Sequence, residues 1–249
     1  MKKFGLIIYF ILFLWATCLA TESEKLNYVV TYKWGLIHKA AGDVEIHKNP
    51  QGNGYELKLI AKTRPWADKI FKVRDTLISV TQKEKYKPVT YTNIAHEKNR
   101  FKKDIIKFSR AGNQVKGNVE RYKEDKKGNV KHSFKELEAT GETYDMLSVY
   151  FLLRELDYNT MKTGEVFKAN IFSGSKKENL EVKCIGKETI KLQDKTEHEA
   201  WHIQFKFTQG EGKKSSDDIN CWVSTQPSHI PLLIVGNLPV GTVRVNYVP

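Results

Sequence analysis

The strict alternation of apolar and polar residues constrains the fold of this chain more than any other feature of its sequence. Apolar side chains occupy every second position from Tyr55 to Ala61 and again from Trp201 to Phe207. A period of two places these side chains on one face of a β-strand, which buries that face and leaves the other wet. The same alternation recurs at Ile219, Cys221 and Val223 and at Val243, Val245 and Tyr247. The pattern predicts a mainly β chain built as antiparallel sheet.

The connections between these strands carry turn-forming residues. Glycine, asparagine and proline gather at residues 49–54, 111–113, 127–129, 173–175 and 210–212. Such spacing is typical of successive hairpins rather than of βαβ units. With 40% hydrophobic and 11% aromatic residues, the chain has enough apolar side chains for a buried core. We expect residues 21–249 to form a single mainly β domain.

One segment breaks the strand pattern. Residues 143–156 carry apolar side chains at helical spacing on nearly every side, and Thr143 or Asp145 is placed to cap the N-terminus of a helix. A helix this apolar has to be largely covered. We therefore expect one α-helix that plugs the sheet or packs against it.

The N-terminus has the features of a secretory signal peptide. Lys2 and Lys3 precede an apolar run over residues 4–16, and small residues follow at Cys18 and Ala20. We expect cleavage after Ala20, with residues 1–20 as the signal peptide and an exported mature chain. Two alternatives stay open, an uncleaved membrane anchor and lipidation at Cys18.

Two cysteines remain in the mature chain, Cys184 and Cys221. An oxidising compartment would permit a disulfide between them. Both lie in strand-like segments, and in a meander they would sit two strands apart, which is too wide a gap for a bridge. We expect two buried thiols, with a disulfide as the alternative.

Three segments resemble an exported bacterial family, domain-of-unknown-function family 3108. They are the opening Tyr32-Lys33-Trp34-Gly35-Leu36-Ile37, the central stretch from Tyr144 to Arg154, and the closing Cys221-Trp222-Val223-Ser224 with Gly241-Thr242-Val243. The resemblance extends over essentially the whole mature chain. It implies an antiparallel curved sheet or barrel-like fold with one covering α-helix. It implies no activity.

The segment His198-Glu199-Ala200-Trp201-His202 matches the H-E-x-x-H pattern of zinc metalloproteases. That chemistry needs a helix, on which residues four apart approach closely enough to share one Zn²⁺. Here the match continues into the alternating strand that ends at Phe207. On a strand the two histidines would lie about 13 Å apart. We therefore expect no metal site at His198, Glu199 and His202, although a metal-dependent hydrolase stays as an unfavoured alternative.

The chain is basic, with a formal net charge of +12. Lysines and arginines gather at residues 83–87 and 98–110, and the predicted signal peptide argues against nucleic acid as their partner. Lysines on strand edges prevent aggregation of sheets. The alternative is that they attract an anionic partner such as a lipid headgroup or an acidic glycan.

These features favour a non-enzymatic protein of the bacterial envelope, exported to the periplasm, that binds an amphiphile or a glycan and needs no cofactor. Trp34, Tyr150 and Trp222 are its candidate ligand-binding residues. A membrane surface is a further possible partner, nucleic acid is not, and the sequence does not fix the oligomeric state. The main alternative is a structural or adaptor protein of the envelope that binds no ligand.

Overall fold

The computed structural model describes residues 23–97, 100–209, 213–214, 218–238 and 241–249. In these residues all 16 strands belong to one sheet, in the order β8-β7-β6-β5-β4-β3-β2-β1-β16-β15-β14-β12-β11-β10-β9, with β13 paired to β12. Every pairing is antiparallel except that of β9 with β10. The predicted signal peptide and its alternatives at Cys18 lie outside the described residues.

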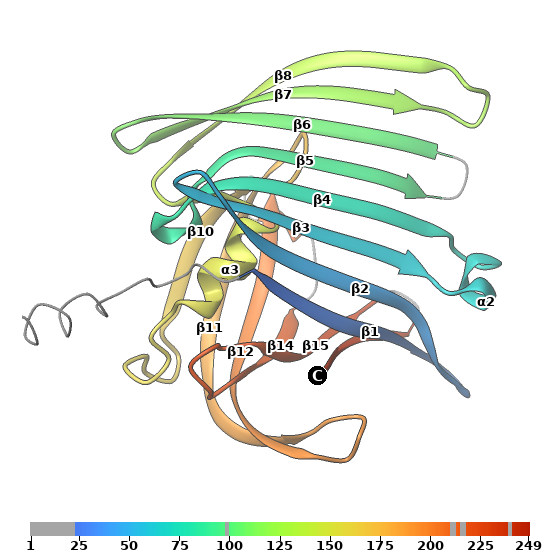
Figure 1. Ribbon diagram of the computed structural model, residues 1–249, viewed down its shortest axis with the longest axis vertical. Coiled ribbons are helices and arrows are strands. Elements are labelled where there is room, and N and C mark those ends of the chain that lie inside the picture. The colour runs from blue at the N-terminus through green and yellow to red at the C-terminus, as the bar shows by residue number, and fades with distance from the viewer. Residues whose placement is uncertain (1–22, 98–99, 210–212, 215–217, 239–240) are drawn as a thin grey trace, which may run out of the picture.

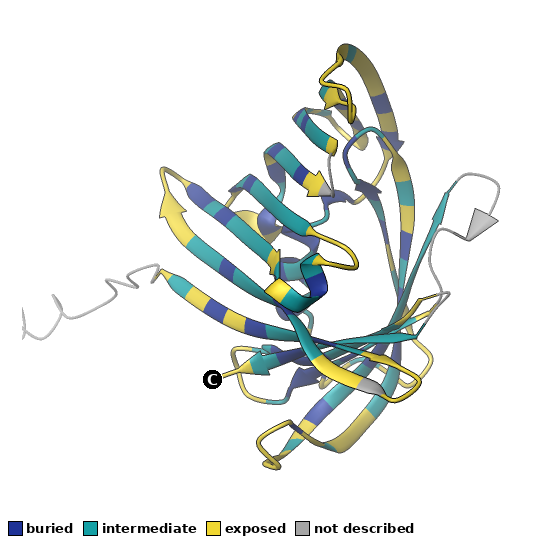
Figure 2. Cartoon of the chain, turned by 90° about the vertical axis from the view of Figure 1, so that its right-hand side faces the viewer, coloured by how far each residue is buried: buried dark blue, intermediate teal, exposed yellow. Residues whose placement is uncertain are grey.

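The first limb of the sheet is a meander of eight strands joined by hairpins. Its strands are β1 (Glu24–Trp34), β2 (Ile37–Gln51), β3 (Gly54–Thr63), β4 (Val73–Gln82), β5 (Pro88–Glu97), β6 (Arg100–Ala111), β7 (Gln114–Glu124) and β8 (Val130–Thr140). Buried and exposed residues alternate along them, as Figure 2 shows. The alternation predicted from Tyr55 to Ala61 is confirmed in β3, where Tyr55 and Leu57 face the core.

The second limb contains the remaining strands, and its last strand in the chain pairs with β1 on the side opposite to β2. Its strands are β9 (Thr143–Asp145), β10 (Val166–Phe172), β11 (Lys177–Lys191), β12 (Glu197–Gln209), β13 (Lys213–Lys214), β14 (Ile219–Ser224), β15 (Pro231–Asn237) and β16 (Thr242–Val248). The strong curvature of the whole sheet brings the two limbs to face each other (Figure 1). The predicted fold class, a mainly β chain with a curved, barrel-like sheet and a covering helix, is confirmed.

The barrel is nearly closed: the β1–β16 ladder joins the two limbs on one side, and side chains near β8 and β11 join them on the other. Lys135 Nζ donates to the carbonyl oxygen of Ser175 at 3.0 Å, and Lys177 Nζ donates to that of Glu138 at 3.2 Å. On the inner side Phe172 packs against Gly117, where a Cβ atom would lie only 2.7 Å from the ring. Only glycine leaves room for this close approach.

The helix α3 (Ser148–Arg154) lies inside the curve of the sheet, between the two limbs (Figure 1). Leu147, just before it, and Phe151 pack into the core of the first limb. Val149 and Leu152 pack into the core of the second. This single apolar helix therefore joins both cores, which confirms that it plugs the sheet.

The helix is shorter than the sequence predicts, because residues 143–145 form strand β9 instead. Their backbone pairs with β10, in register from Asn170 to Phe172. The helical turn begins only after Asp145, whose Oδ1 accepts hydrogen bonds from the backbone N–H groups of Leu147 and Ser148, both at 2.8 Å. Of the two predicted caps, Thr143 and Asp145, it is therefore Asp145 that caps the helical turn.

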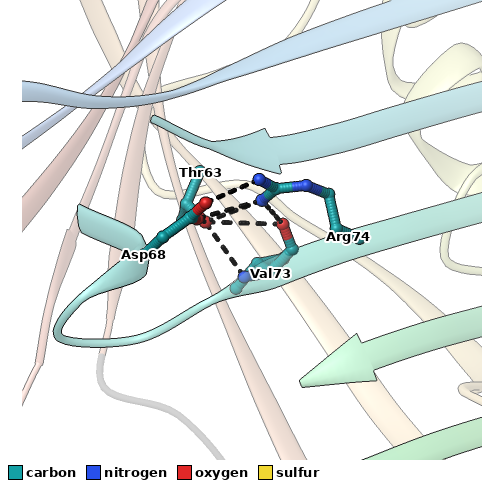
Figure 3. A network of polar contacts seen from close by, with 4 residues as sticks. All are labelled: Thr63, Asp68, Val73 and Arg74. Carbon is teal, nitrogen blue, oxygen red and sulfur yellow. Dashed lines mark hydrogen bonds and ion pairs between the residues drawn. The ribbon is translucent and has the colours of Figure 1, made fainter. Parts of the chain in front are cut away.

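A short helix, α2 (Pro65–Asp68), and the one-turn 3₁₀ helix η1 (Glu84–Tyr86) lie in the connections of the first limb. A polar network fixes α2 to the neighbouring strands (Figure 3). The guanidinium of Arg74 donates to both carboxylate oxygens of Asp68, at 3.1 and 2.7 Å, and to the hydroxyl of Thr63 at 3.0 Å. The hydroxyl of Thr63 also accepts from the N–H of Val73 at 3.0 Å. The network closes the β3–β4 connection.

Cys184 lies on β11 and Cys221 on β14, with β12 between them in the sheet. Both are free and buried, which confirms the prediction of two buried thiols. Among the described residues, no helix is long and apolar enough to cross a membrane.

Candidate functional site

The strongest candidate site is a cavity of about 240 Å³ between α3 and the second limb. Its floor is the inner face of β11, β12, β14 and β15, and its wall is one side of α3. The residues that line it are Met146, Val149, Tyr150, Leu153, Arg154, Leu180, Ile203, Phe205, Phe207, Ile219, Cys221, Val223, Pro231 and Ile234. All but Tyr150, Arg154 and Cys221 are purely apolar. Such a surface suits the hydrocarbon part of a ligand.

The alternation of strands explains why the floor is apolar. Ile203 and Phe205 on β12 are paired with Cys221 and Ile219 on β14. Cys221 is in turn paired with Ile234 on β15. Because paired residues of neighbouring strands point to the same side of a sheet, these side chains form one continuous inner surface.

The cavity has a buried end and a more exposed end. Val149, Ile203 and Val223 are almost completely inaccessible, whereas Phe205 and Phe207 are half-buried. The gradient along β12 places the mouth of the cavity toward Phe207. A ligand would enter there and reach the inner end beside Ile203.

Two polar groups at the cavity, the Tyr150 hydroxyl and the Arg154 guanidinium, already have protein hydrogen-bond partners. The hydroxyls of Tyr150 and Tyr28 share a hydrogen bond of 2.7 Å, and burial raises the pKa of Tyr28 well above its ordinary value. Burial raises the pKa of the Cys221 thiol to about 12, so it stays protonated at neutral pH. None of these groups is poised for acid–base or nucleophilic chemistry.

Arg154 is the one charged residue of the cavity lining, and hydrogen bonds to two partners hold its guanidinium in place. Its two terminal nitrogens donate to the two carboxylate oxygens of Glu24 at 2.8 Å each. Its Nε and one terminal nitrogen donate to the carbonyl oxygen of Ser228 at 3.1 and 2.9 Å. This latch ties the C-terminal end of α3 to the start of β1 and to the β14–β15 turn.

Half-buried apolar residues extend the inner surface beyond the cavity. From Ile234 the cross-strand pairs lead through Val245 on β16 to Val30 on β1. On the first limb the same inner face carries Val44, Leu59 and Leu77, which pack beside its core without being fully buried. We call these partly exposed residues the concave apolar surface: Val30, Val44, Leu59, Leu77, Ile234 and Val245.

Of the three ligand-binding residues expected from the sequence, only Tyr150 lines the cavity. Trp34 ends β1 at the β1–β2 hairpin and is 54% exposed. Trp222 lies on the opposite face of β14 from Cys221, where its ring stacks on that of His202 with centroids 4.6 Å apart. The structure therefore does not bring the three together, and a binding role for Trp34 or Trp222 stays a prediction.

The H-E-x-x-H segment lies on β12, as predicted. His202 is on the outer face, where it contacts Glu188 at 3.0 Å and hydrogen-bonds Asn220 at 2.9 Å. Glu199 forms an ion pair of 2.9 Å with Lys187, and His198 contacts Thr196. In an extended strand the two histidines are about 13 Å apart, too far to share one zinc ion.

The sequence pattern did not single out the residues that make the cavity. Ile203, Phe205, Cys221 and Val223 are visible in it as inward-facing strand residues. What it does not show is that α3 stands off from them and leaves a space. The sequence signal for this space was the presence of Tyr150 and Arg154 on a helix that is otherwise almost entirely apolar.

Comparison with known proteins places the chain in a family and supports the fold. The sequence profile of a protein family of unknown function, DUF3108, matches residues 27–247. The chain is similar in structure to a β-barrel-like protein of the domain-of-unknown-function family DUF1849 from Brucella abortus, with a TM-score of 0.61 and 12% sequence identity. The alignment covers 90% of this chain and 94% of that one. The comparison with curated proteins finds no match.

Proposed function

Since the chain belongs to the DUF3108 family, whose function is unknown, we propose a function from the geometry of its own site: non-enzymatic binding of an amphiphile. The apolar part of the ligand would occupy the cavity between α3 and the second limb. The observation that carries the proposal is this cavity, apolar on nearly all sides and open toward Phe207.

The size of the cavity suits a short hydrocarbon chain or one or two rings. Engineered apolar cavities of about 150 Å³ bind benzene, and this one has about 240 Å³. A longer chain would continue onto the concave apolar surface, where Ile234 and Val245 are only half-buried. Covering those side chains removes apolar area from water, and this supplies the driving force for binding.

An apolar fluorophore tests the cavity directly. N-phenyl-1-naphthylamine is neutral and brightens in apolar surroundings, so we expect saturable binding to the purified protein. Ile234→Trp places a large ring in the cavity and should weaken binding at least tenfold. Ile60→Trp adds the same bulk on the outer face of β3 and should leave binding unchanged. Circular dichroism of both variants checks that they fold.

Native mass spectrometry of protein purified without detergent supplies the second measurement. A retained lipid-like mass that is lost in Ile234→Trp would support the proposal and indicate the class of ligand. A bare protein mass, together with fluorophore binding that Ile234→Trp does not weaken, would contradict it.

We also propose that the protein acts outside the cytoplasm, in keeping with the basic and apolar N-terminus. N-terminal sequencing of protein recovered from the periplasm of a bacterial host tests this directly. We expect Thr21 as the first residue. A chain that starts at Met1 would contradict export, and a membrane-bound chain that starts at a lipidated Cys18 would contradict cleavage after Ala20.

A further inference from the structure

Three lysines lie directly opposite one another on neighbouring strands of the first limb. Lys102 on β6 is paired with Lys123 on β7, and Lys123 is paired with Lys131 on β8. Directly opposed residues have their Cβ atoms about 5 Å apart. The three side chains therefore leave the sheet in a short row across the strands, which we call the lysine row.

The lysine row is on the inner face of the sheet. Lys102 points to the same face of β6 as Asp104 and Ile106, both of which are fully buried. Lys123 points to the same face of β7 as Arg121 and Val119. No bulge interrupts the register of β6 with β7 or of β7 with β8. The row thus continues the concave face on which the core is built.

Like charges directly opposite one another destabilise a sheet, so this arrangement costs free energy unless something neutralises it. Among the described residues, none of the three ammonium groups has an ion-pair or hydrogen-bond partner, whereas Lys116 on β7 contacts Glu136 and Glu138. Protection of a sheet edge explains only Lys131, because β8 is at the edge while β6 and β7 each have neighbours on both sides.

The row borders an open hollow of about 520 Å³ at this end of the strands, and Arg100 is also in its lining. Two acidic residues line it as well. Asp125 is engaged in its own turn, where it accepts from the backbone of Lys127 at 2.8 Å and from the side chain of Asn129 at 2.8 Å. Glu124 is out of step with Lys123 on β7 and belongs to the other face of the strand. The inner wall of the hollow is therefore positive.

We infer that the hollow is a binding site for a phosphate-type polyanion, held by the ammonium groups of Lys102, Lys123 and Lys131. Several negatively charged oxygens on one group match three neighbouring lysine side chains, and each lysine offers up to three N–H bonds. The phosphate could belong to the headgroup of a lipid or to a free polyphosphate. The site is separate from the apolar cavity, and its evidence does not depend on that cavity.

Isothermal titration with inorganic tripolyphosphate tests the site without any apolar contribution. Because each exposed charge pair contributes modestly and three are removed at once, we expect the combined substitution Lys102→Gln, Lys123→Gln and Lys131→Gln to weaken binding about tenfold or more. The control replaces Lys162, Lys183 and Lys195 by Gln. These lysines are exposed, have no ion pair among the described residues, and give the same change in net charge. Binding to the control should stay within about twofold of the wild-type value.

A second titration, with monomeric dihexanoyl phosphatidic acid, separates the two sources of phosphate. Tighter binding of the lipid than of tripolyphosphate, lost in the lysine-row variant, assigns the site to a lipid headgroup. Equal or tighter binding of tripolyphosphate assigns it to a free polyanion. Equal losses in the lysine-row and control variants, or no binding of either probe by the wild type, would overturn the inference. Because N-phenyl-1-naphthylamine is uncharged, its binding reports on the cavity independently.

Discussion

Replacement of Arg154 by Met tests whether the latch at the end of α3 holds the helix in place. The substitution keeps most of the apolar stem and removes four hydrogen bonds, two to Glu24 and two to the carbonyl oxygen of Ser228. The side chains of Arg154 and Glu24 are only 8% and 23% exposed, so water screens the pair little. Breaking a buried pair costs about 3–5 kcal/mol. Since water can reach Glu24, we expect the lower end, about 3 kcal/mol.

A double-mutant cycle with Glu24→Gln isolates the pair from the other contacts of Arg154. Two parallel charge-assisted hydrogen bonds predict a coupling free energy of about 2 kcal/mol. The assay is unfolding in urea, followed by tryptophan fluorescence, for the wild type, both single variants and the double variant. The matched control is the cycle Lys187→Met with Glu199→Gln, an ion pair of 2.9 Å whose side chains are 44% and 63% exposed. That pair should couple by less than about 1 kcal/mol.

The pH dependence of the same pair gives an independent check. Burial alone would raise the pKa of Glu24, but the hydrogen bonds and attraction of Arg154 and the nearby Lys48 outweigh it and hold the pKa below the ordinary value of 4.5. A carboxyl group with a lowered pKa contributes stability that is complete above its unfolded-state pKa and is lost as the pH falls through the folded-state pKa. The stability difference between wild type and Glu24→Gln should therefore be full at pH 7 and shrink below pH 4.5. A coupling below about 0.5 kcal/mol, or a difference that does not change with pH, would refute the latch.

Three further predictions concern the core. Phe151→Ala should lower the free energy of unfolding in urea by about 3–5 kcal/mol, because the ring is 2% exposed. Gly117→Ala should lower it by about 1–3 kcal/mol, because its methyl group would lie 2.7 Å from the buried ring of Phe172; a neutral effect would show that this ring moves freely. Cys184 and Cys221 should react as two thiols with a colorimetric thiol reagent only after unfolding, and rapid reaction of the folded protein would contradict their burial.

The strands were predictable because the alternation that specifies each of them lies within its own stretch of sequence. The alternation from Trp201 to Phe207 specifies which side chains of β12 face inward, and the paired register with β14 confirms it. The position of the two cysteines followed from the same reasoning, since hairpins connect neighbouring strands. The apolar side chains of a strand keep their period of two however the strands of a meander are placed relative to one another.

The limits of helix α3 depended on a distant partner. Residues 143–145 have a helical pattern of apolar side chains, but β10 offers them a strand partner some 27 residues away in sequence, with Thr143 beside Asn170. For the helix, tertiary pairing rather than local propensity decides the outcome. Trp222 was expected at the ligand because it is large and aromatic; alternation on β14 places it on the face opposite to Cys221, and its binding role stays a prediction.

The concave face of this sheet is chemically divided, and the division follows from which strands face α3. The strands of the second limb pack against an apolar helix, so their inward positions are apolar as far as the mouth at Phe207. The inner face of β6 and β7 changes from Ile106 and Val119, which belong to the core, to the ion pair of the buried Asp104 with Arg121. Two residues further along β6 and β7, the same inner face carries the lysine row.

A ligand with a hydrocarbon part and an anionic part has the same division. Its apolar part would be stabilised by area removed from water, which depends little on salt, whereas its charged part would depend strongly on ionic strength. If one molecule uses both sites, added salt should weaken the binding of phosphatidic acid and leave that of N-phenyl-1-naphthylamine unchanged. If the sites serve separate ligands, saturating tripolyphosphate should leave the retained lipid in place. The division of one concave face into an apolar and a basic part therefore makes competition between the two ligands the decisive observation.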